Sequence, residues 1–170
     1  MSTQEVQQKS GGDQRQLVVF QLGGEGYCVD ISKVREINRV VDITKIPESP
    51  EFVEGVINLR GQIIPIIDLR KRFGLTIESE RSGNADNRIM VVETNGNIVG
   101  FIVDAVREVL RISNENIEPT PDLVSSDIDR QYIEGVATIN NRLLIIVNAD
   151  YIFATHELKA LDTINTDDSN

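Results

Sequence analysis

The apolar residues of this chain fall in short blocks separated by glycine, asparagine and proline. The blocks are rich in valine and isoleucine and are mostly too short for helices, a pattern typical of β-strands joined by tight turns. The sequence therefore predicts a mainly β fold with ten strands. The ten blocks are Leu17–Leu22, Tyr27–Ile31, Val34–Ile46, Val53–Leu59, Ile63–Ile67, Ile89–Glu93, Ile98–Val103, Val106–Ile112, Ile133–Ile139 and Leu143–Val147.

Residues that tolerate a positive φ lie between several of these blocks. We expect hairpin turns at Gly23–Gly26, Arg60–Gly61, Asn95–Asn97 and Asn140–Asn141, because glycine and asparagine suit the reversal of a hairpin. Pro65 lies inside a block, and proline cannot donate a hydrogen bond to a neighbouring strand. That strand is therefore expected to be an edge strand or to carry a bulge at Pro65.

The two halves of the chain show a weak internal repeat. Val34–Ile37 recurs as Val106–Val109, 72 positions later, and Glu54–Val56 recurs as Glu134–Val136, 80 positions later. The difference fits extra loop in the second half, placed in Thr120–Arg130. Each half then offers five strands, and two such halves would each close into a small barrel that removes most open sheet edges.

The chain is expected to form two subdomains between polar tails, which lack the large apolar side chains that offset the entropy of ordering. A polar stretch would connect the subdomains. The expected boundaries are 1–15 for a disordered N-terminal tail, about 16–75 for the first subdomain, 76–87 for the linker, about 88–148 for the second subdomain, about 149–161 for a C-terminal helix and 162–170 for an acidic tail.

Few helices are expected. A short one should follow Asp68, whose side chain can cap it, and end before Gly74. The C-terminal helix should begin near Ala149 after the cap Asn148, and its apolar face, which includes His156, would dock on the strands.

The charge and composition exclude several functions. A formal net charge of −10 argues against binding to nucleic acid or to anionic membrane surfaces. The chain has no apolar run near the roughly 20 residues that a membrane span needs, and its polar start does not resemble a signal peptide. We therefore expect a cytoplasmic protein without direct membrane insertion.

The residues needed for catalysis or metal binding are scarce. Cys28 is the only cysteine and His156 the only histidine, so neither a disulfide, a nucleophile–histidine pair nor a usual transition-metal site is predicted. Turn formation or capping explains Asp30, Asp68 and Asp104 at strand ends. We predict no catalytic, cofactor-binding or metal-binding residues, although an acid pair assembled by folding stays open.

The stretch from Tyr27 to Phe73 carries a resemblance. Its motifs include Tyr27–Ile31, Val34–Ile37, Asn58–Gly61 and Asp68–Arg70. They closely resemble the family of the chemotaxis coupling protein CheW, and the resemblance extends from about Gln16 to Leu161. It implies two intertwined five-stranded Src-homology-3-like β-barrels without catalytic activity.

The resemblance also implies the partners. Members of this family bind the histidine kinase CheA through its regulatory domain, and they bind the cytoplasmic tip of methyl-accepting chemotaxis receptors. The chain would then be an adaptor in bacterial signal transduction that is cytoplasmic and recruited to membrane receptor clusters.

The candidate binding residues lie on the repeat and on one turn. Arg60, between Leu59 and Gly61, would extend a planar guanidinium that can pair with a carboxylate of a partner or of its own Glu36. Valine and isoleucine in the repeat could form a docking surface or simply fill the barrels. Gly55 could allow close approach of a partner or form a structural bend. The candidates are Val34, Glu36, Ile37, Gly55, Asn58, Arg60, Gly61, Val106 and Val109.

Other functions remain open at this point. Within the same family, the chain could be a detached regulatory domain of the kinase or the adaptor half of a fused response-regulator protein. In another class, it could be a small-molecule-binding β-barrel or an enzyme that uses carboxylates. A large closed pocket with convergent polar groups would support that second class.

Overall fold

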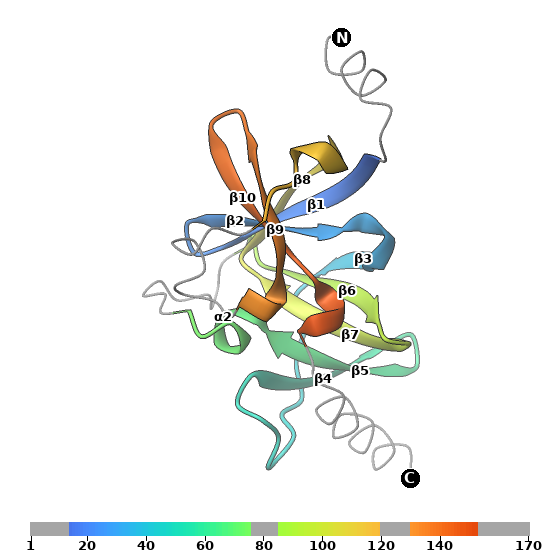
Figure 1. The fold of residues 1–170 in the computed structure, drawn as a ribbon. Coiled ribbons are helices and arrows are strands. Elements are labelled where there is room, and N and C mark those ends of the chain that lie inside the picture. The colour runs from blue at the N-terminus through green and yellow to red at the C-terminus, as the bar shows by residue number, and fades with distance from the viewer. Residues whose placement is uncertain (1–13, 76–84, 120–129, 153–170) are drawn as a thin grey trace.

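The computed structural model describes residues 14–75, 85–119 and 130–152. Their ten strands form two five-stranded sheets, which lie one above the other in Figure 1. Sheet A has the order β8-β1-β2-β10-β9, and sheet B has the order β3-β6-β7-β5-β4. The strands are β1 (Gln14–Leu22), β2 (Glu25–Asp30), β3 (Val34–Arg39), β4 (Val53–Leu59), β5 (Gln62–Asp68), β6 (Arg88–Thr94), β7 (Asn97–Val103), β8 (Ala105–Ser113), β9 (Ile133–Ile139) and β10 (Arg142–Val147).

Each sheet contains strands from both halves of the chain. Sheet A joins β1 and β2 of the first half to β8, β9 and β10 of the second, and sheet B has the reverse composition. The expectation that the five strands of one half close on each other is therefore wrong. The chain passes from one sheet to the other twice, after β2 and after β7. We call these two passages the crossovers.

The internal repeat is confirmed. Adding 72 to the bounds of β1, β2 and β3, and 80 to those of β4 and β5, gives the bounds of β6 to β10 to within two residues. The two sheets also have the same order of equivalent strands. The repeats have exchanged strands, so equivalent residues lie on opposite sheets.

The core has three parts, one between the sheets and one on the other side of each sheet. The largest cluster lies between the sheets and combines Phe20 and Tyr27 of sheet A with Met90 and Phe101 of sheet B. A second cluster, including Leu17, packs only residues of sheet A and its flanking segments, and a third packs only those of sheet B. Successive residues of β1 alternate between the first and second clusters, as the twofold period of a strand requires.

The expected hairpin turns are confirmed. Arg60, Asn95, Asn140 and Asn141 have φ values of 52°, 53°, 54° and 66°, and Gly23 has a φ of 65°. Glycine and asparagine adopt this region with little cost, whereas arginine does not. Arg60 is therefore the residue that fits its turn least well.

The prediction for Pro65 is wrong, because β5 lies between β4 and β7 and its register with β4 shifts elsewhere, between Val53 and Gly55. Pro65 faces Val56, whose N–H and C=O both bond to Thr44 on the opposite side. The nitrogen of Pro65 therefore points toward β7, where pairing begins only at the next residue. An N–H at Pro65 would have no hydrogen-bond acceptor in either neighbouring strand, so proline costs the sheet no hydrogen bond.

The short helix after β5 is confirmed as α2 (Leu69–Arg72), in which the Asp68 side chain accepts a hydrogen bond from the Arg70 N–H at 2.9 Å. Asn148 caps a 3-10 turn at Ala149–Tyr151. The expected N-terminal tail ends two residues too late, because Gln14 and Arg15 belong to β1. The rest of that tail, the acidic tail, the rest of the expected C-terminal helix, most of the linker and most of the extra loop lie outside the described residues. In the described ranges the longest helix has four residues, too short to cross a bilayer.

Candidate functional site

The turn between β4 and β5 presents Arg60 to solvent. The Asn58 side chain accepts a hydrogen bond from the Gly61 N–H at 2.8 Å, which closes the turn beneath Arg60. The Arg60 side chain is 69% exposed. The turn therefore holds a charged, bidentate donor at the end of a rigid hairpin.

Arg60 forms an ion pair with Glu36 of β3, as one of the two sequence hypotheses expected. Glu36 also accepts a hydrogen bond from the Asn38 side chain at 3.0 Å. The hydrogen bond from Arg60 is the main reason that the pKa of Glu36 lies below its usual value, and Asn38 adds to the effect. The Glu36 carboxylate is thus held in its charged form at neutral pH.

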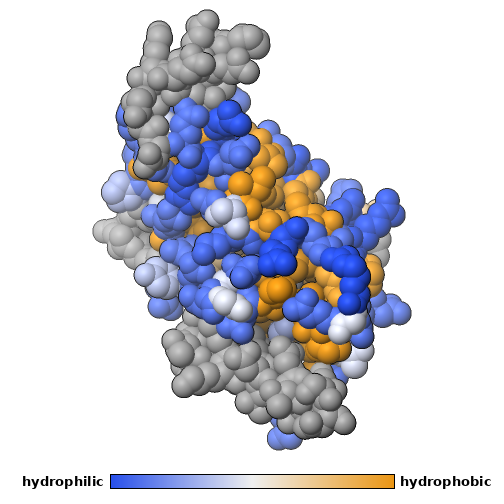
Figure 2. Space-filling model, turned by 90° about the vertical axis from the view of Figure 1, so that its right-hand side faces the viewer, coloured by the Kyte–Doolittle hydropathy of each residue, from blue (hydrophilic) through white to orange (hydrophobic). Residues whose placement is uncertain are grey.

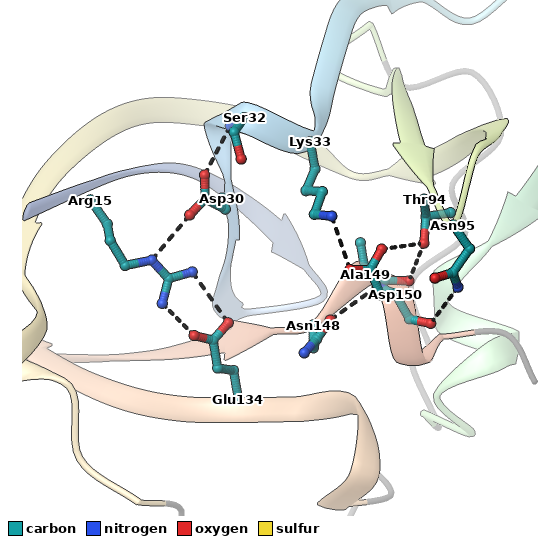
Figure 3. Close-up of polar contacts among 10 residues, drawn as sticks. All are labelled: Arg15, Asp30, Ser32, Lys33, Thr94, Asn95, Glu134, Asn148, Ala149 and Asp150. Atoms are coloured by element: carbon teal, nitrogen blue, oxygen red, sulfur yellow. Dashed lines mark hydrogen bonds and ion pairs between the residues drawn. The ribbon is translucent and has the colours of Figure 1, made fainter.

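This ion pair joins opposite ends of sheet B. In the ladder, β3 is the first strand and β4 the last, so contact between β3 and the β4–β5 turn requires the sheet to curl. Sheet A is similar, because Arg15 of β1 donates to Asp30 of β2 at 3.0 Å and to Glu134 of β9 at 3.2 Å (Figure 3). Burial alone would raise the pKa of Asp30, but hydrogen bonds from Ser32 and Arg15 hold it below its usual value.

A hollow of about 260 Å³ lies beside the ion pair. It is smaller than the 300 to 1,000 Å³ or so of typical ligand pockets, and Glu36 and Arg60 in its wall are already paired with each other. The hollow is thus too small for most metabolites. The hollow is lined by Arg35, Glu36, Leu59, Arg60, Gln62, Ile64, Val91 and Ile98.

Exposed apolar residues continue along β3 and the segment after it. Ile37 is 40% exposed, Val40 41% and Val41 52%. Figure 2 shows a band of apolar side chains between hydrophilic ones on the side where β3 lies in Figure 1. Val34 differs, since it packs against the core between the sheets. We give the name sheet B face to the surface around the outer strand β3 and the β4–β5 turn, with Arg60, Glu36 and Ile37.

Sheet A carries an equivalent arrangement. Glu108 of β8, the repeat equivalent of Glu36, lies 3.5 Å from Arg142 at the start of β10. Val109 and Leu143 beside them are 50% and 42% exposed, whereas Val106 packs against the core. The sequence reasoning included Val109 but missed Arg142, although the repeat of Glu36 as Glu108 was a signal for a second pair. We call Glu108, Val109, Arg142 and Leu143 the sheet A face.

Gly55 is explained within the chain itself. It has a φ of 149°, and a Cβ there would lie 2.1 Å from the backbone oxygen of Thr44. At the repeat equivalent Gly135, a Cβ would lie 2.8 Å from the backbone oxygen of Glu118. Both glycines let a strand accept an extra backbone bridge, Thr44 with Val56 and Glu118 with Val136. The structural alternative therefore accounts for both.

The described residues contain no group of three histidine, cysteine or acidic side chains placed to hold a metal ion. Cys28 is fully buried, and burial raises the pKa of its thiol to about 12, which leaves it unreactive. Asp30 and Asp68 cap short helices as expected. Asp104 differs: its partners are Gly23 and Arg70, far away in the sequence. Local turn formation therefore does not explain Asp104.

Comparison with known proteins assigns the family. The family model described as CheW-like domain matches residues 16–157. The probable chemotaxis protein CheW of Rhizobium etli is 37% identical over 91% of this chain and 97% of its own length. The chemotaxis protein CheW of Treponema pallidum is 37% identical over 88% of each chain.

A solved structure agrees in both sequence and fold. The crystal structure of the scaffolding protein TtCheW from Thermoanaerobacter tengcongensis matches with a TM-score of 0.76 and 44% identity, over 85% of this chain and 91% of that one. The two sheets and the exposed ion-paired turn thus occur in a chain that matches a scaffolding protein over most of its length. The chain belongs to the CheW-like domain family, and it is a chemotaxis adaptor and not an enzyme.

Proposed function

We propose that this chain couples the histidine kinase CheA, through the regulatory domain of the kinase, to the cytoplasmic tip of methyl-accepting chemotaxis receptors at membrane receptor clusters. The observation that carries the proposal is the exposed Arg60–Glu36 pair beside apolar residues of β3. A charged rim next to exposed apolar side chains is the usual composition of a protein docking site.

Each of the two faces would hold one partner. The faces are chemically alike, with an arginine–glutamate pair next to exposed valine, leucine or isoleucine. They lie on different sheets, so one chain could contact two proteins at once. Arg60 and Arg142 would give specificity by pairing with partner carboxylates, and the apolar residues would supply buried area.

The finer architecture belongs to the same proposal. We infer that each curled sheet behaves as a small barrel, because the Arg60–Glu36 and Arg142–Glu108 pairs connect β-strands that are not neighbours in their ladders. A rigid barrel presents its turn without losing conformational entropy on binding.

The test reverses one charge on each face. Arg60→Glu places two carboxylates together and should weaken one partner on the order of tenfold, while the melting temperature stays nearly unchanged. Arg142→Glu is the matched control and should weaken the other partner. Binding of receptor-tip fragments and of the kinase regulatory domain is measured separately for each variant.

The double variant Glu36→Arg with Arg60→Glu restores the ion pair in reverse. If the pair served only to hold the turn, the double variant would recover binding. Continued loss supports a direct contact between Arg60 and a partner. Wild-type binding by Arg60→Glu would contradict the proposal for the sheet B face.

A further inference from the structure

Both crossovers between the sheets are held by ion pairs. After β7, Asp104 accepts hydrogen bonds from Arg70 at 3.1 and 2.6 Å and from the Gly23 N–H at 2.6 Å. Arg70 follows β5 of sheet B, whereas Gly23 lies in the β1–β2 turn of sheet A. The side chains of Arg70 and Asp104 are only 13% and 14% exposed. Asp104 therefore binds both sheets at one partly buried point.

The other crossover has the same arrangement with opposite charges (Figure 3). Lys33, after β2, donates to Asp150 at 2.9 Å, and Asp150 also accepts from the Thr94 hydroxyl at 2.8 Å. Asp150 is the repeat equivalent of Arg70, 80 positions later. At one crossover the acid Asp104 follows β7 and the base Arg70 follows β5, whereas at the other the base Lys33 follows β2 and the acid Asp150 follows β10.

A third contact joins the two repeats. The Arg72 guanidinium lies 4.5 Å from the ring centre of Phe52 and 5.2 Å from that of Tyr132. Its Nε donates to the backbone oxygen of Ile152 at 2.7 Å. Phe52 and Tyr132 are repeat equivalents, as are Arg72 and Ile152, each pair 80 positions apart. Arg72 is therefore held by both repeats at the place where they meet.

Lys71, the neighbour of Arg72 in α2, has a different contact. Its amine donates to Glu54 of β4 at 2.8 Å, and both residues belong to the sheet B side. The two neighbouring cations of α2 therefore differ in the elements that they connect. Lys71 connects elements of one sheet, and Arg72 connects the two sheets.

We propose that Arg72 is a positioning residue that fixes the angle between the two sheets, and with it the angle between the sheet A face and the sheet B face. The core between the sheets is apolar, and apolar contact has little directionality. A guanidinium between two rings with a hydrogen bond to a carbonyl is directional. This inference rests on the proposed function, since it concerns how two docked partners are oriented.

Assembly with both partners should depend on this angle, whereas binding of one partner should not. Arg72→Met keeps an unbranched apolar stem like that of arginine and removes the cation and the donor. We expect the affinity of Arg72→Met for each partner alone to stay within about twofold of the wild-type value. The amount of kinase regulatory domain that the adaptor carries down with receptor-tip assemblies should fall on the order of tenfold. Lys71→Met should leave all three quantities unchanged.

A distance measurement tests the angle itself. Arg39 of β3 and Thr138 of β9 are exposed and lie on different sheets. Each can be changed to cysteine and spin-labelled, because the native Cys28 is fully buried. Wild type and Lys71→Met should give one narrow distance distribution by electron paramagnetic resonance, and Arg72→Met a broader one.

The outcomes are separable. Unchanged sedimentation and an unchanged distance distribution in Arg72→Met would overturn the inference, as would equal losses of single-partner binding. If Arg72→Met unfolds, Arg72→Lys, which keeps the charge but lacks the planar group, must show the same selective loss of joint assembly. If wild type itself binds neither partner, the proposed function fails instead.

Discussion

Replacing Arg60 with asparagine should separate stability from binding. Arg60 has a φ of 52°, whereas its repeat equivalent Asn140 adopts 54° with a residue suited to that conformation. Relief of the left-handed conformation is worth about 1 kcal/mol. The lost ion pair opposes this gain only weakly, because the Arg60 side chain is 69% exposed.

With both contributions combined, Arg60→Asn should raise the melting temperature slightly, by about 2 °C for a chain of this size, as measured by calorimetry. Binding of the partner that occupies the sheet B face should fall on the order of tenfold, measured by calorimetric titration. The reverse change, Asn140→Arg, should lower stability by about 1 kcal/mol and leave that partner unaffected.

A fall of several degrees in Arg60→Asn would refute this reasoning, because the ion pair would then dominate the turn. Unchanged binding would refute the assignment of Arg60 to a partner contact. If the variant is more stable but binds more weakly, then arginine is kept at this position for binding, at a cost in stability from its left-handed conformation.

Three further predictions follow from the structure. Gly55→Ala should destabilise the fold by about 3 kcal/mol in chemical denaturation, since its Cβ meets backbone, whereas Gly61→Ala, with open space around it, should cost about 1 kcal/mol. Cys28 should resist a thiol reagent until the chain unfolds, and its raised pKa means that stability is lost as the pH rises from about 9 towards about 12, a loss that Cys28→Ala should remove. Burial alone would raise the pKa of Asp150, but hydrogen bonds from Lys33 and Thr94 lower it. The ionised Asp150 therefore stabilises the fold above the usual carboxyl pKa range, and this stabilisation is lost as the pH falls below that range. In Lys33→Met, titration of the Asp150 carboxyl by nuclear magnetic resonance should give a higher pKa. An alkaline loss of stability that persists in Cys28→Ala would contradict the first of these assignments, and an unchanged Asp150 pKa in Lys33→Met would contradict the second.

Local features of the fold could be predicted because they depend on short stretches of sequence. The strands follow from blocks of valine and isoleucine, and the turns from residues such as Asn95 and Gly96 that tolerate positive φ. The cap of α2 follows from Asp68 in the same way. Each of these features is decided by neighbours within a few residues.

The exchange of strands could not be read from the same evidence. Because the repeats resemble each other, β1 could pair with β8 of the other repeat or with β3, the equivalent of β8 in its own repeat, and both arrangements satisfy the same hydrophobic pattern. Pro65 was misjudged for a related reason, since the position of its nitrogen depends on where β7 begins to pair. Such choices depend on long-range register.

The candidate site was predicted in part. The pairing of Arg60 with Glu36 was one of two hypotheses and is confirmed. The sequence did not indicate that Val34 and Val106 pack against the core, nor that Arg142 completes a second pair. Which of several valines on a strand faces solvent depends on the curl of the sheet, which no local pattern specifies.

The most direct measurement is analytical ultracentrifugation of the full chain mixed with a receptor-tip fragment and the kinase regulatory domain, each alone and both together. We expect a complex with each protein and a larger complex that contains all three. Mutually exclusive binding of the two proteins, or binding of neither, would contradict the claim that two separate rigid faces serve two partners.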